Sequence, residues 1–222
     1  MRQRDALAKR MSVILWNGMI MPRHAAALLA ALFAAACSPA ATDAPSAGGS
    51  VAGCMSRAYP NIGGPISLVN QDGEPVTEET YKGHPTLIYF GFTYCPDVCP
   101  MTLVTVKRAY DRLPEGVEPP QTLLISIDPE RDTPEQLATY VSTKAFPANL
   151  QGLSGTPEQV RAAADAFMAD YSRIEQPGSE SEYSMDHTSL LYLMDEDWKL
   201  KTFFTHEDTD ASIAACLAEQ LK

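Results

Sequence analysis

The amino-acid sequence predicts a mixed α/β fold, in which helices cover a β-sheet. Two short apolar runs, residues 86–93 and 121–128, have the length and composition of buried strands. Two helices are expected to begin at residues 133–136 and 156–159, which share the sequence TPEQ. The expected order of elements, β-β-β-α-β-α-α-β-β-α, alternates strands with helices and therefore favours a layered α/β domain.

The first strands and the first helix flank a cluster of cysteines and prolines. Residues 66–69 and 74–77 lie on either side of Gln71-Asp72-Gly73, a turn signature, and so predict an N-terminal β-hairpin. Pro100 can begin a helix, and we expect Cys99 to be the N-cap, because a proline further inside the helix would break a hydrogen bond. The apolar side chains that follow are spaced for one buried face: Leu103, Val106, Tyr110 and Leu113.

Both TPEQ segments have the pattern of a capping box. Threonine is placed at the N-cap, proline at the first helical position and glutamine three residues after the threonine. In the second of these helices the expected buried stripe is Val160, Ala164, Phe167 and Tyr171. We interpret the repetition as shared capping chemistry and not as an internal repeat.

The C-terminal part predicts a second hairpin and a closing helix. Residues 188–194 and 199–204 alternate around the turn 195–198. Asp208 or Thr209 then caps a helix. Its inward side chains are Ile213, Leu217 and Leu221. A strand, a cysteine pair and a helix, followed by another strand and a terminal hairpin, is the order of a thioredoxin-like fold.

The charge of the chain excludes several classes of partner. Its 222 residues contain 17 Lys and Arg against 28 Asp and Glu, a formal net charge of −11. The first 37 residues hold five basic groups and one acidic group, so the remainder has 12 basic and 27 acidic groups, a net charge of −15. Binding to nucleic acid or to anionic lipid needs clustered positive charge, so neither is expected. A basic protein partner fits this charge better than an acidic one.

The chain begins with the features of an export signal. Basic residues precede twelve apolar residues, 25–36, a run too short to span a membrane. The small residues that end in Cys37 resemble the lipobox of bacterial lipoproteins, so acylation of Cys37 competes with simple cleavage nearby. Residues 38–58 are rich in Ala, Ser, Gly and Pro and predict a flexible tether. We therefore expect a signal at 1–37, a tether, and a domain at 59–222 that is periplasmic and tethered to the membrane.

The segment GFTYCPDVCP, residues 91–100, carries the clearest indication of chemistry. Cys95 and Cys99 follow a buried strand, and the N-terminus of a helix lowers the pKa of a thiol placed there. A structural disulfide is the plain alternative, but closing so small a loop stabilises a protein by only about 2 kcal/mol. We therefore favour redox or metal chemistry.

The spacing of the two cysteines separates several thiol chemistries. Thioredoxin-type oxidoreductases use C-x-x-C, whereas three residues intervene here, and the T-x-x-C of a peroxide-reducing enzyme is also missing. Two thiolates in one short turn can both bind a single soft metal ion. Thiolates select Cu(I), Zn(II) or iron–sulfur, and an added imidazole also suits Cu(II).

Four histidines are candidates for a third ligand. His24 lies in the predicted signal, His84 lies at the far end of the strand that leads to the cysteines, and His206 is followed by acids and is expected to be solvated. His187 comes before the predicted strand 188–194, and in a thioredoxin-like layout the loop there lies beside the cysteine turn. Thioredoxins have a cis-proline in that loop, but no proline lies between Pro177 and His187, which leaves room for a ligand.

The other side chains near these motifs have simpler explanations. Asp97 either shapes the turn between the cysteines or supports the site. Asp186 either fixes the tautomer of His187 or, as we favour, is a solvated loop acid. Met185 is expected to be a packing residue rather than an axial ligand. Cys216 has helical spacing with its apolar neighbours and is expected to be an inert core thiol. We predict no role for Cys54.

Four segments, in this order and spacing, resemble the Sco/SenC copper proteins of cytochrome c oxidase assembly: GFTYCPDVCP, IDPERDTPEQL, GLSGTPEQV and DHTSLLYLMD. The resemblance covers about residues 62–221. It implies a thioredoxin fold anchored at the membrane, facing the periplasm or the intermembrane space. It also implies one copper, Cu(I) or Cu(II), bound by Cys95, Cys99 and His187. Many family members have a transmembrane anchor, whereas here we expect the lipobox-like Cys37 to attach the protein to the membrane instead.

The resemblance implies a metallochaperone for cytochrome c oxidase subunit II. Such a protein delivers copper to the dinuclear copper site of that subunit or prepares its thiols, and it receives copper or electrons from a periplasmic copper donor or thiol reductant. The alternative is a periplasmic thiol–disulfide oxidoreductase that acts on a copper-site protein without holding copper, with Cys95 and Cys99 as its redox-active pair. Substitution of His187 separates the two, because a reductase survives it and a copper binder does not.

Overall fold

The computed structural model describes Cys54, residues 59–179 and residues 181–222. The predicted signal at 1–37, with Cys37, lies outside the described residues, as does all of the predicted tether except Cys54. Within the described part, no helix has both the length and the apolar character needed to cross a membrane.

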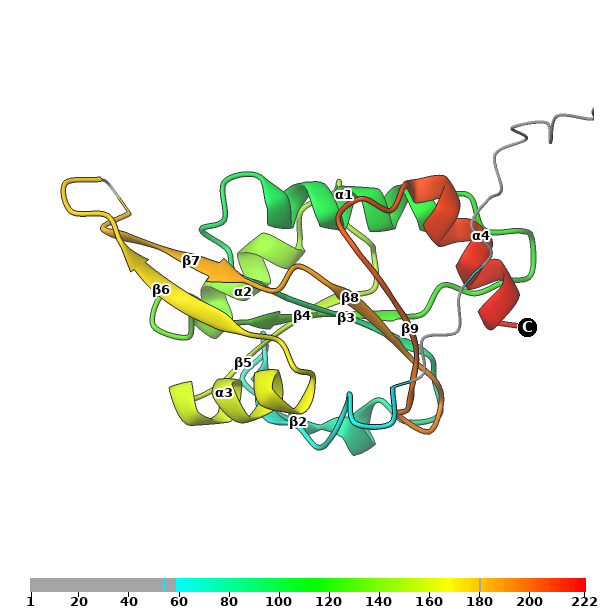
Figure 1. Ribbon diagram of the computed structural model, residues 1–222, viewed down its shortest axis with the longest axis horizontal. Helices are drawn as coiled ribbons and strands as arrows, with labels where there is room; N and C mark the ends of the chain where they lie inside the picture. The colour runs from blue at the N-terminus through cyan, green and yellow to red at the C-terminus, as the bar shows by residue number, and fades with distance from the viewer. Residues whose placement is uncertain (1–53, 55–58, 180) are drawn as a thin grey trace, which may run out of the picture. The chain divides into compact units, whose positions relative to one another are not determined.

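A seven-stranded sheet lies at the centre of the described fold (Figure 1). The strand order is β2-β1-β5-β4-β3-β8-β9, in which β3, β4 and β5 run parallel, while β1 and β8 pair antiparallel with β5 and β3. The strands are β1 (Ser67–Asn70), β2 (Pro75–Thr77), β3 (Thr86–Gly91), β4 (Gln121–Ser126), β5 (Leu150–Ser154), β8 (Leu191–Met194) and β9 (Leu200–Phe204). Every residue of β3 is buried, which explains why this strand is a continuous apolar run.

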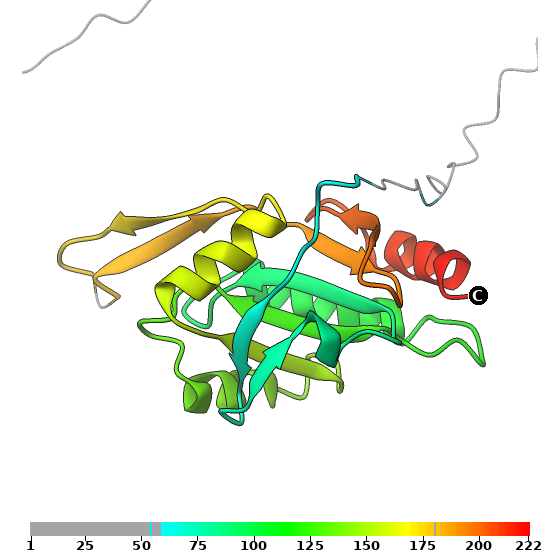
Figure 2. The same ribbon diagram turned by 90° about the horizontal axis from the view of Figure 1, so that it is seen from below.

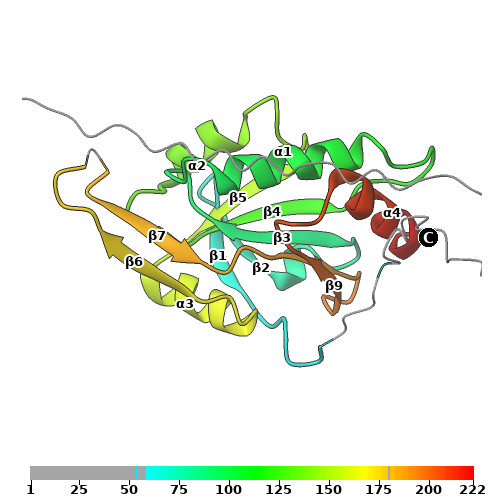
Figure 3. The ribbon, with the colours of Figure 1, turned by 45° about the horizontal axis from the view of Figure 1, so that its top comes forward.

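Helices cover both faces of the sheet. Helices α1, α2 and α4 lie on one face and α3 lies on the other (Figures 1 and 3). Their bounds are α1 (Val98–Tyr110), α2 (Pro134–Val141), α3 (Pro157–Ala166) and α4 (Asp210–Gln220), and a short 3-10 helix, η1 (Glu78–Thr80), follows β2. Figure 2 shows the face covered by α3. Phe167, directly after α3, packs there against Phe90 and Tyr192, with ring centroids 5.6 and 5.4 Å away.

Two further strands form a separate ribbon. Strand β6 (Tyr171–Glu175) pairs antiparallel with β7 (Tyr183–His187), and the two make a two-stranded sheet that extends from one end of the central sheet (Figures 1 and 3). Strand β6 is largely exposed, whereas β7 is mostly half-buried or buried. Strand β7 is thus the more buried of the two, and it ends at His187.

The mixed α/β fold, the N-terminal hairpin and the C-terminal hairpin with its closing helix are confirmed. The three predicted caps are also present: the side-chain oxygens of Thr133, Thr156 and Thr209 accept hydrogen bonds from the backbone N–H groups of the residues three positions on, at 3.4, 3.3 and 3.1 Å. Thr156 has the complete capping box, with its own N–H donating to the Gln159 side chain.

The predicted start of the first helix is wrong. Helix α1 begins at Val98 with Asp97 as its N-cap, so Cys99 is its second residue and Pro100 its third. The N–H groups of the first turn have no partner within a helix, so proline at this position removes no hydrogen bond. The prediction allowed proline only at the first position and so placed the helix two residues too late.

Three strands were missing or misplaced in the prediction. Strand β5 was not expected, because Gln151 and Gly152 interrupt its apolar residues; Gly152 lies under α2, where a Cβ would come 3.0 Å from Leu137 Cβ. Helix α3 ends at Ala166, so Tyr171 belongs to β6 and not to the helical stripe. His187 ends β7 and does not precede a strand directly, since β8 begins only at Leu191.

Candidate metal centre

The cysteine turn joins the end of β3 to the start of α1. Cys95 lies in the turn and is half-buried, whereas Cys99 lies in the first turn of α1 and is fully buried, and both are free thiols. The Cys99 N–H, one of the unpaired donors of the first helical turn, donates to the Cys95 sulfur at 3.3 Å. The N-terminus of α1 therefore hydrogen-bonds the Cys95 sulfur, and the Cys99 side chain is part of its first turn.

Gly91, the last residue of β3, leaves the space in which Cys99 packs. A Cβ at this position would lie 3.1 Å from the Cys99 sulfur and 2.9 Å from the ring carbon Cε1 of Tyr89. Such distances are too short for carbon beside sulfur or an aromatic ring. The first residue of the GFTYCPDVCP segment is thus glycine because of close packing beneath the buried cysteine.

His187 reaches the cysteine turn from the end of β7. Its Nε2 lies 3.8 Å from the Cys99 sulfur, although 88 residues separate the two along the chain. Its Nδ1 lies 3.2 Å from the Thr188 carbonyl oxygen, which only accepts, so Nδ1 donates to it and Nε2 is the ring nitrogen that faces the Cys99 sulfur. The imidazole meets the rings of Phe92 and Tyr89 in edge contacts, with centroids 6.0 and 6.1 Å away. These contacts orient Nε2 toward the sulfur.

The two cysteines differ in protonation. A hydrogen bond from the Cys99 thiol lowers the pKa of Cys95 to about 4, with smaller contributions from His187 and from backbone N–H groups and against the opposing effect of burial. The same hydrogen bond, together with burial and the negative charge on Cys95, raises the pKa of Cys99 above its usual range. Without metal, the site therefore holds a thiolate at Cys95 and a thiol at Cys99.

The donor set fits a soft metal ion. Two sulfurs and one imidazole suit Cu(I), and the imidazole also admits Cu(II). Metal–sulfur and metal–nitrogen bonds of about 2.3 and 2.0 Å, as found for zinc, span the 3.8 Å between Cys99 Sγ and His187 Nε2 at an angle near 120°. Among the described residues, no three His, Cys, Asp or Glu side chains are already gathered tightly enough to hold a metal.

The other histidines in the described structure, and the two residues before His187, lie where residues without a direct role at the metal centre are expected. His84 and His206 are exposed, and His84 precedes the opposite end of β3. Asp186 is exposed, and the Thr188 carbonyl rather than this carboxylate bonds His187. Met185 is half-buried and packs against the core, as predicted. His24 lies outside the described residues.

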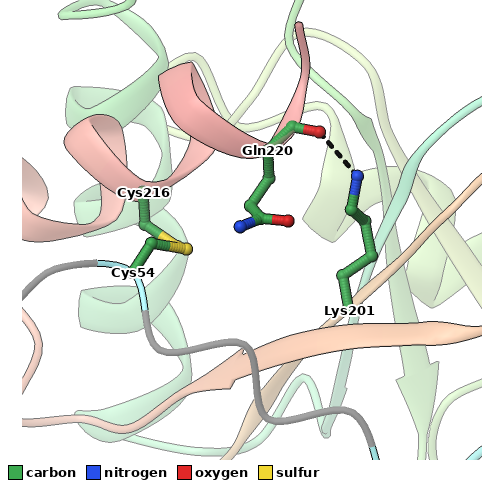
Figure 4. The surroundings of a disulfide bond; sticks show 4 residues. All are labelled: Cys54, Lys201, Cys216 and Gln220. Carbon is green, nitrogen blue, oxygen red and sulfur yellow. Dashed lines mark hydrogen bonds between the residues drawn. A yellow bond between two sulfur atoms is a disulfide. The ribbon is translucent and has the colours of Figure 1, made fainter.

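The prediction of an inert thiol at Cys216 is wrong, and its partner is Cys54, to which the sequence assigned no role. The two form a disulfide that links the start of the described chain to α4, across 162 residues (Figure 4). Nearby, the Lys201 ammonium donates to the Gln220 carbonyl oxygen at the end of α4, at 2.6 Å. Helical spacing correctly placed Cys216 in the interior, but no local pattern in the sequence shows which distant cysteine it meets. Cys95 and Cys99 remain as the free pair among the described cysteines.

Sequence reasoning also missed the residues that surround the metal ligands. Two of them lie in the loop between β4 and α2. Asp132 accepts a hydrogen bond from the Thr93 hydroxyl at 2.6 Å. The Arg131 guanidinium lies 4.7 Å from the centroid of the Tyr94 ring. The only signal for them was a run of charged residues between a buried strand and a capped helix. Such a run is usually solvated, whereas Asp132 is completely buried.

The fold and the site together define a class of protein: thioredoxin-like proteins in which a distant strand places a histidine beside a Cys-x-x-x-Cys turn. A model of the SCO1/SenC family matches residues 55–222, and the chain belongs to this family. The predicted resemblance and fold class are thereby confirmed.

Individual relatives give the same result. The human "Protein SCO1 homolog, mitochondrial" is 41% identical over 168 residues, which are 73% of this chain and 54% of the human protein. "Protein SenC" of Rhodobacter capsulatus is 37% identical over 153 residues, 69% of this chain and 67% of that protein. This chain spans about half the length of several curated relatives that it matches, such as the plant, human and mouse proteins.

Two solved structures are similar over most of their length. Arabidopsis thaliana ScoI with copper bound is 36% identical, with a TM-score of 0.67 and coverage of 72% of this chain and 97% of that one. Bradyrhizobium japonicum ScoI with copper bound is 37% identical, with a TM-score of 0.63 and coverage of 72% and 99%.

Proposed function

We propose that this chain binds one copper ion through Cys95, Cys99 and His187 and hands it to an acceptor protein. The observation that carries this proposal is the distance of 3.8 Å between Cys99 Sγ and His187 Nε2, two residues that lie 88 positions apart in the sequence. The fold thus places the Nε2 edge of an imidazole beside a cysteine pair. Related structures that hold copper support copper as the metal.

The charge and number of the ligands suit transfer. Two thiolates and a neutral imidazole give a net charge of −1 around Cu(I) and zero around Cu(II), so neither oxidation state places a large charge in a half-buried site. Three protein ligands leave a position open for a ligand of the acceptor. Oxidation of Cys95 and Cys99 to a disulfide removes both sulfur ligands, which couples copper loading to the redox state of the pair.

We propose the dinuclear copper site of cytochrome c oxidase subunit II as the acceptor. Family resemblance supports this choice, and one structural relative, BsSco, is described as a member of the Sco family of cytochrome c oxidase assembly proteins. The cysteine turn is also accessible to a protein, because Tyr94, Val98 and Met101 around it are exposed by 53%, 44% and 60%. Exposed apolar side chains grouped at one site favour protein contact.

A second function, thiol–disulfide exchange, is favoured by the difference between the two cysteines. The Cys95 thiolate can attack a disulfide of a partner, forming a mixed disulfide and releasing one partner thiolate. Cys99 then gives its proton to that thiolate and attacks the Cys95 sulfur, which closes the Cys95–Cys99 disulfide and releases the second partner sulfur. The partner is reduced and this chain is oxidised, with two electrons transferred.

We propose that the domain works in the periplasm, tethered to the membrane through an N-terminal anchor at Cys37. The support for this is the apolar run at 25–36, the small residues before Cys37 and the Ala/Ser/Gly/Pro-rich stretch after it. Cys37→Ser is expected to move the protein from the membrane fraction to the soluble periplasmic fraction. Unchanged attachment of the variant to membranes would contradict lipidation at Cys37.

Copper titration with a histidine variant tests the proposed function. The reduced chain is expected to bind one copper, and His187→Ala is expected to lose most of the affinity in a competition assay against a copper chelator. His84→Ala is the matched control, because it removes an exposed histidine before the opposite end of β3 and should bind as the parent does. If His187→Ala kept the parent affinity, or if the reduced chain bound no copper but exchanged disulfides rapidly, the oxidoreductase would be the better assignment.

A further inference from the structure

One loop contacts both parts of the candidate metal centre. It runs from the end of β4 to the start of α2 and includes Asp128, Arg131 and Asp132. The cysteine turn follows β3, and His187 ends β7, so the two parts of the site belong to different sheets. The loop is a physical connection between them.

Asp132 holds the residues that lead into the cysteine turn. Its carboxylate accepts hydrogen bonds from the Thr93 N–H at 2.9 Å and the Thr93 hydroxyl at 2.6 Å, and from the Ser126 hydroxyl at 2.6 Å. Thr93 lies two residues before Cys95. The loop is therefore fixed relative to the cysteine turn.

Arg131 extends from this fixed loop to both sides. Its guanidinium lies over the Tyr183 ring, 3.6 Å from the centroid, and over the Tyr94 ring, 4.7 Å from the centroid. Its Nη1 donates to the backbone carbonyls of Ser181 and Tyr183, each at 3.1 Å. Tyr94 precedes Cys95, whereas Ser181 and Tyr183 belong to the start of β7, so a single side chain joins the two parts of the site.

Asp128 aligns this guanidinium. It is buried, and its carboxylate accepts from Arg131 Nε at 2.5 Å and from the Tyr183 hydroxyl at 2.8 Å. The Arg131 side chain is only 15% exposed, so these interactions are shielded from water and are stronger than surface contacts.

The β6–β7 ribbon needs such a connection. A two-stranded ribbon is at most marginally stable without packing against other elements. Strand β7 pairs only with β6 in the described structure, so backbone pairing does not fix His187 relative to the central sheet. Side-chain contacts from outside the ribbon must do so.

We propose that Arg131 is a positioning residue for the metal centre: by joining Tyr94 to the start of β7, it holds His187 at the cysteine pair. This inference rests on the proposed function, because it assigns a role toward copper to a residue that does not ligate it. It does not make Arg131 a ligand. It predicts that loss of Arg131 acts on copper affinity through His187.

The matched control is Arg173, on the exposed strand β6. Its guanidinium also lies over the Tyr183 ring, 3.7 Å from the centroid, but its ion pairs, with Glu130 of the loop and with Glu175 of β6, are exposed to water. Arg131→Gln is expected to weaken copper affinity about 10- to 100-fold, as supporting residues of metal ligands commonly do. Arg173→Gln is expected to change it less than about threefold, as for other exposed ion pairs.

A double-mutant cycle with His187→Ala distinguishes positioning from general damage. In the His187→Ala background, Arg131→Gln is expected to cause no further loss of copper affinity, because the histidine through which it acts is already gone. Equal losses in both backgrounds would overturn the proposal. Should Arg131→Gln fail to fold, Tyr94→Leu replaces it, because Tyr94 is exposed and its loss removes one side of the contact; about a threefold loss is expected, again only when His187 is present.

Hydrogen exchange on the metal-free protein tests the positioning without copper. Arg131→Gln is expected to speed amide exchange in β7, from Tyr183 to His187, at least tenfold relative to Arg173→Gln, with exchange in β3 unchanged. Unchanged exchange in β7 would overturn the inference. If the parent bound no copper while this exchange difference appeared, the proposed function would fail and the structural role of Arg131 would stand.

Discussion

The pH dependence of Cys95 alkylation follows directly from the structure of the cysteine turn. The Cys99 thiol and the first turn of α1 stabilise the Cys95 thiolate and lower its pKa from 9.0 to about 4. At pH 5 about nine-tenths of Cys95 is then ionised, against about one part in 10⁴ for a thiol of pKa 9.0. Iodoacetamide reacts with thiolate and not with thiol.

The expected rate advantage is smaller than the difference in ionisation. Nucleophilicity falls with pKa, with a Brønsted slope of about 0.4–0.5, so a thiolate shifted by five units is about 100- to 300-fold less reactive. At pH 5 the net advantage of Cys95 over an ordinary thiol is therefore about 30- to 100-fold, and it disappears near pH 7. The shape of the profile is the sharper observable.

Single-site alkylation, followed by mass spectrometry on the reduced chain, gives this profile. Between pH 5 and 8 the rate at Cys95 is expected to be nearly flat, with a fall centred near pH 4, and Cys99 is expected to stay unmodified because it is buried and protonated. A rate that drops tenfold for each pH unit below 8 would refute the reasoning, because it would mean that the helix N-terminus and Cys99 do not stabilise the thiolate. Cys99→Ala is the companion variant, and its profile should move to higher pH because the variant lacks the side-chain donor that stabilises the Cys95 thiolate most.

Two further predictions concern the scaffold of the site. Cys216→Ser opens a disulfide that closes 162 residues and is expected to lower the free energy of unfolding by up to about 5 kcal/mol in a denaturant titration, with copper binding retained. Cys54→Ser should give the same loss, and a different loss in the two variants would mean that the bond is not the cause. Gly91→Ala places a methyl group 3.1 Å from the Cys99 sulfur and is expected to cost about 1–3 kcal/mol of stability and to weaken copper binding. Unchanged copper affinity in Gly91→Ala would show that Cys99 does not need its present position.

The sequence was sufficient for the elements whose signals are local. The apolar run of β3 and the threonine–proline caps of α2 and α3 have patterns complete within ten residues, and β3 and the starts of both helices lie where they were predicted. The cysteine pair was also recognisable, because its spacing, its prolines and the preceding strand lie in one segment. Elements that are determined by neighbouring residues can therefore be predicted from a short segment of the sequence.

What the sequence missed depends on contacts between distant residues. Strand β6 is mostly polar and exposed, so it has no apolar alternation, and it is identifiable only through its pairing with β7. The partner of Cys216 lies 162 residues away, and the burial of Asp132 depends on the return of β3 beside β4. His187 was found as a candidate only through an assumed layout, and the predicted strand following it was placed too early.

The most direct test of the central claim is X-ray absorption at the copper edge on the copper-loaded chain. The account predicts two sulfur ligands and one nitrogen ligand per copper in the parent, and loss of the nitrogen with retention of both sulfurs in His187→Ala. A copper environment without nitrogen in the parent, or one unchanged in His187→Ala, would contradict a centre made of Cys95, Cys99 and His187.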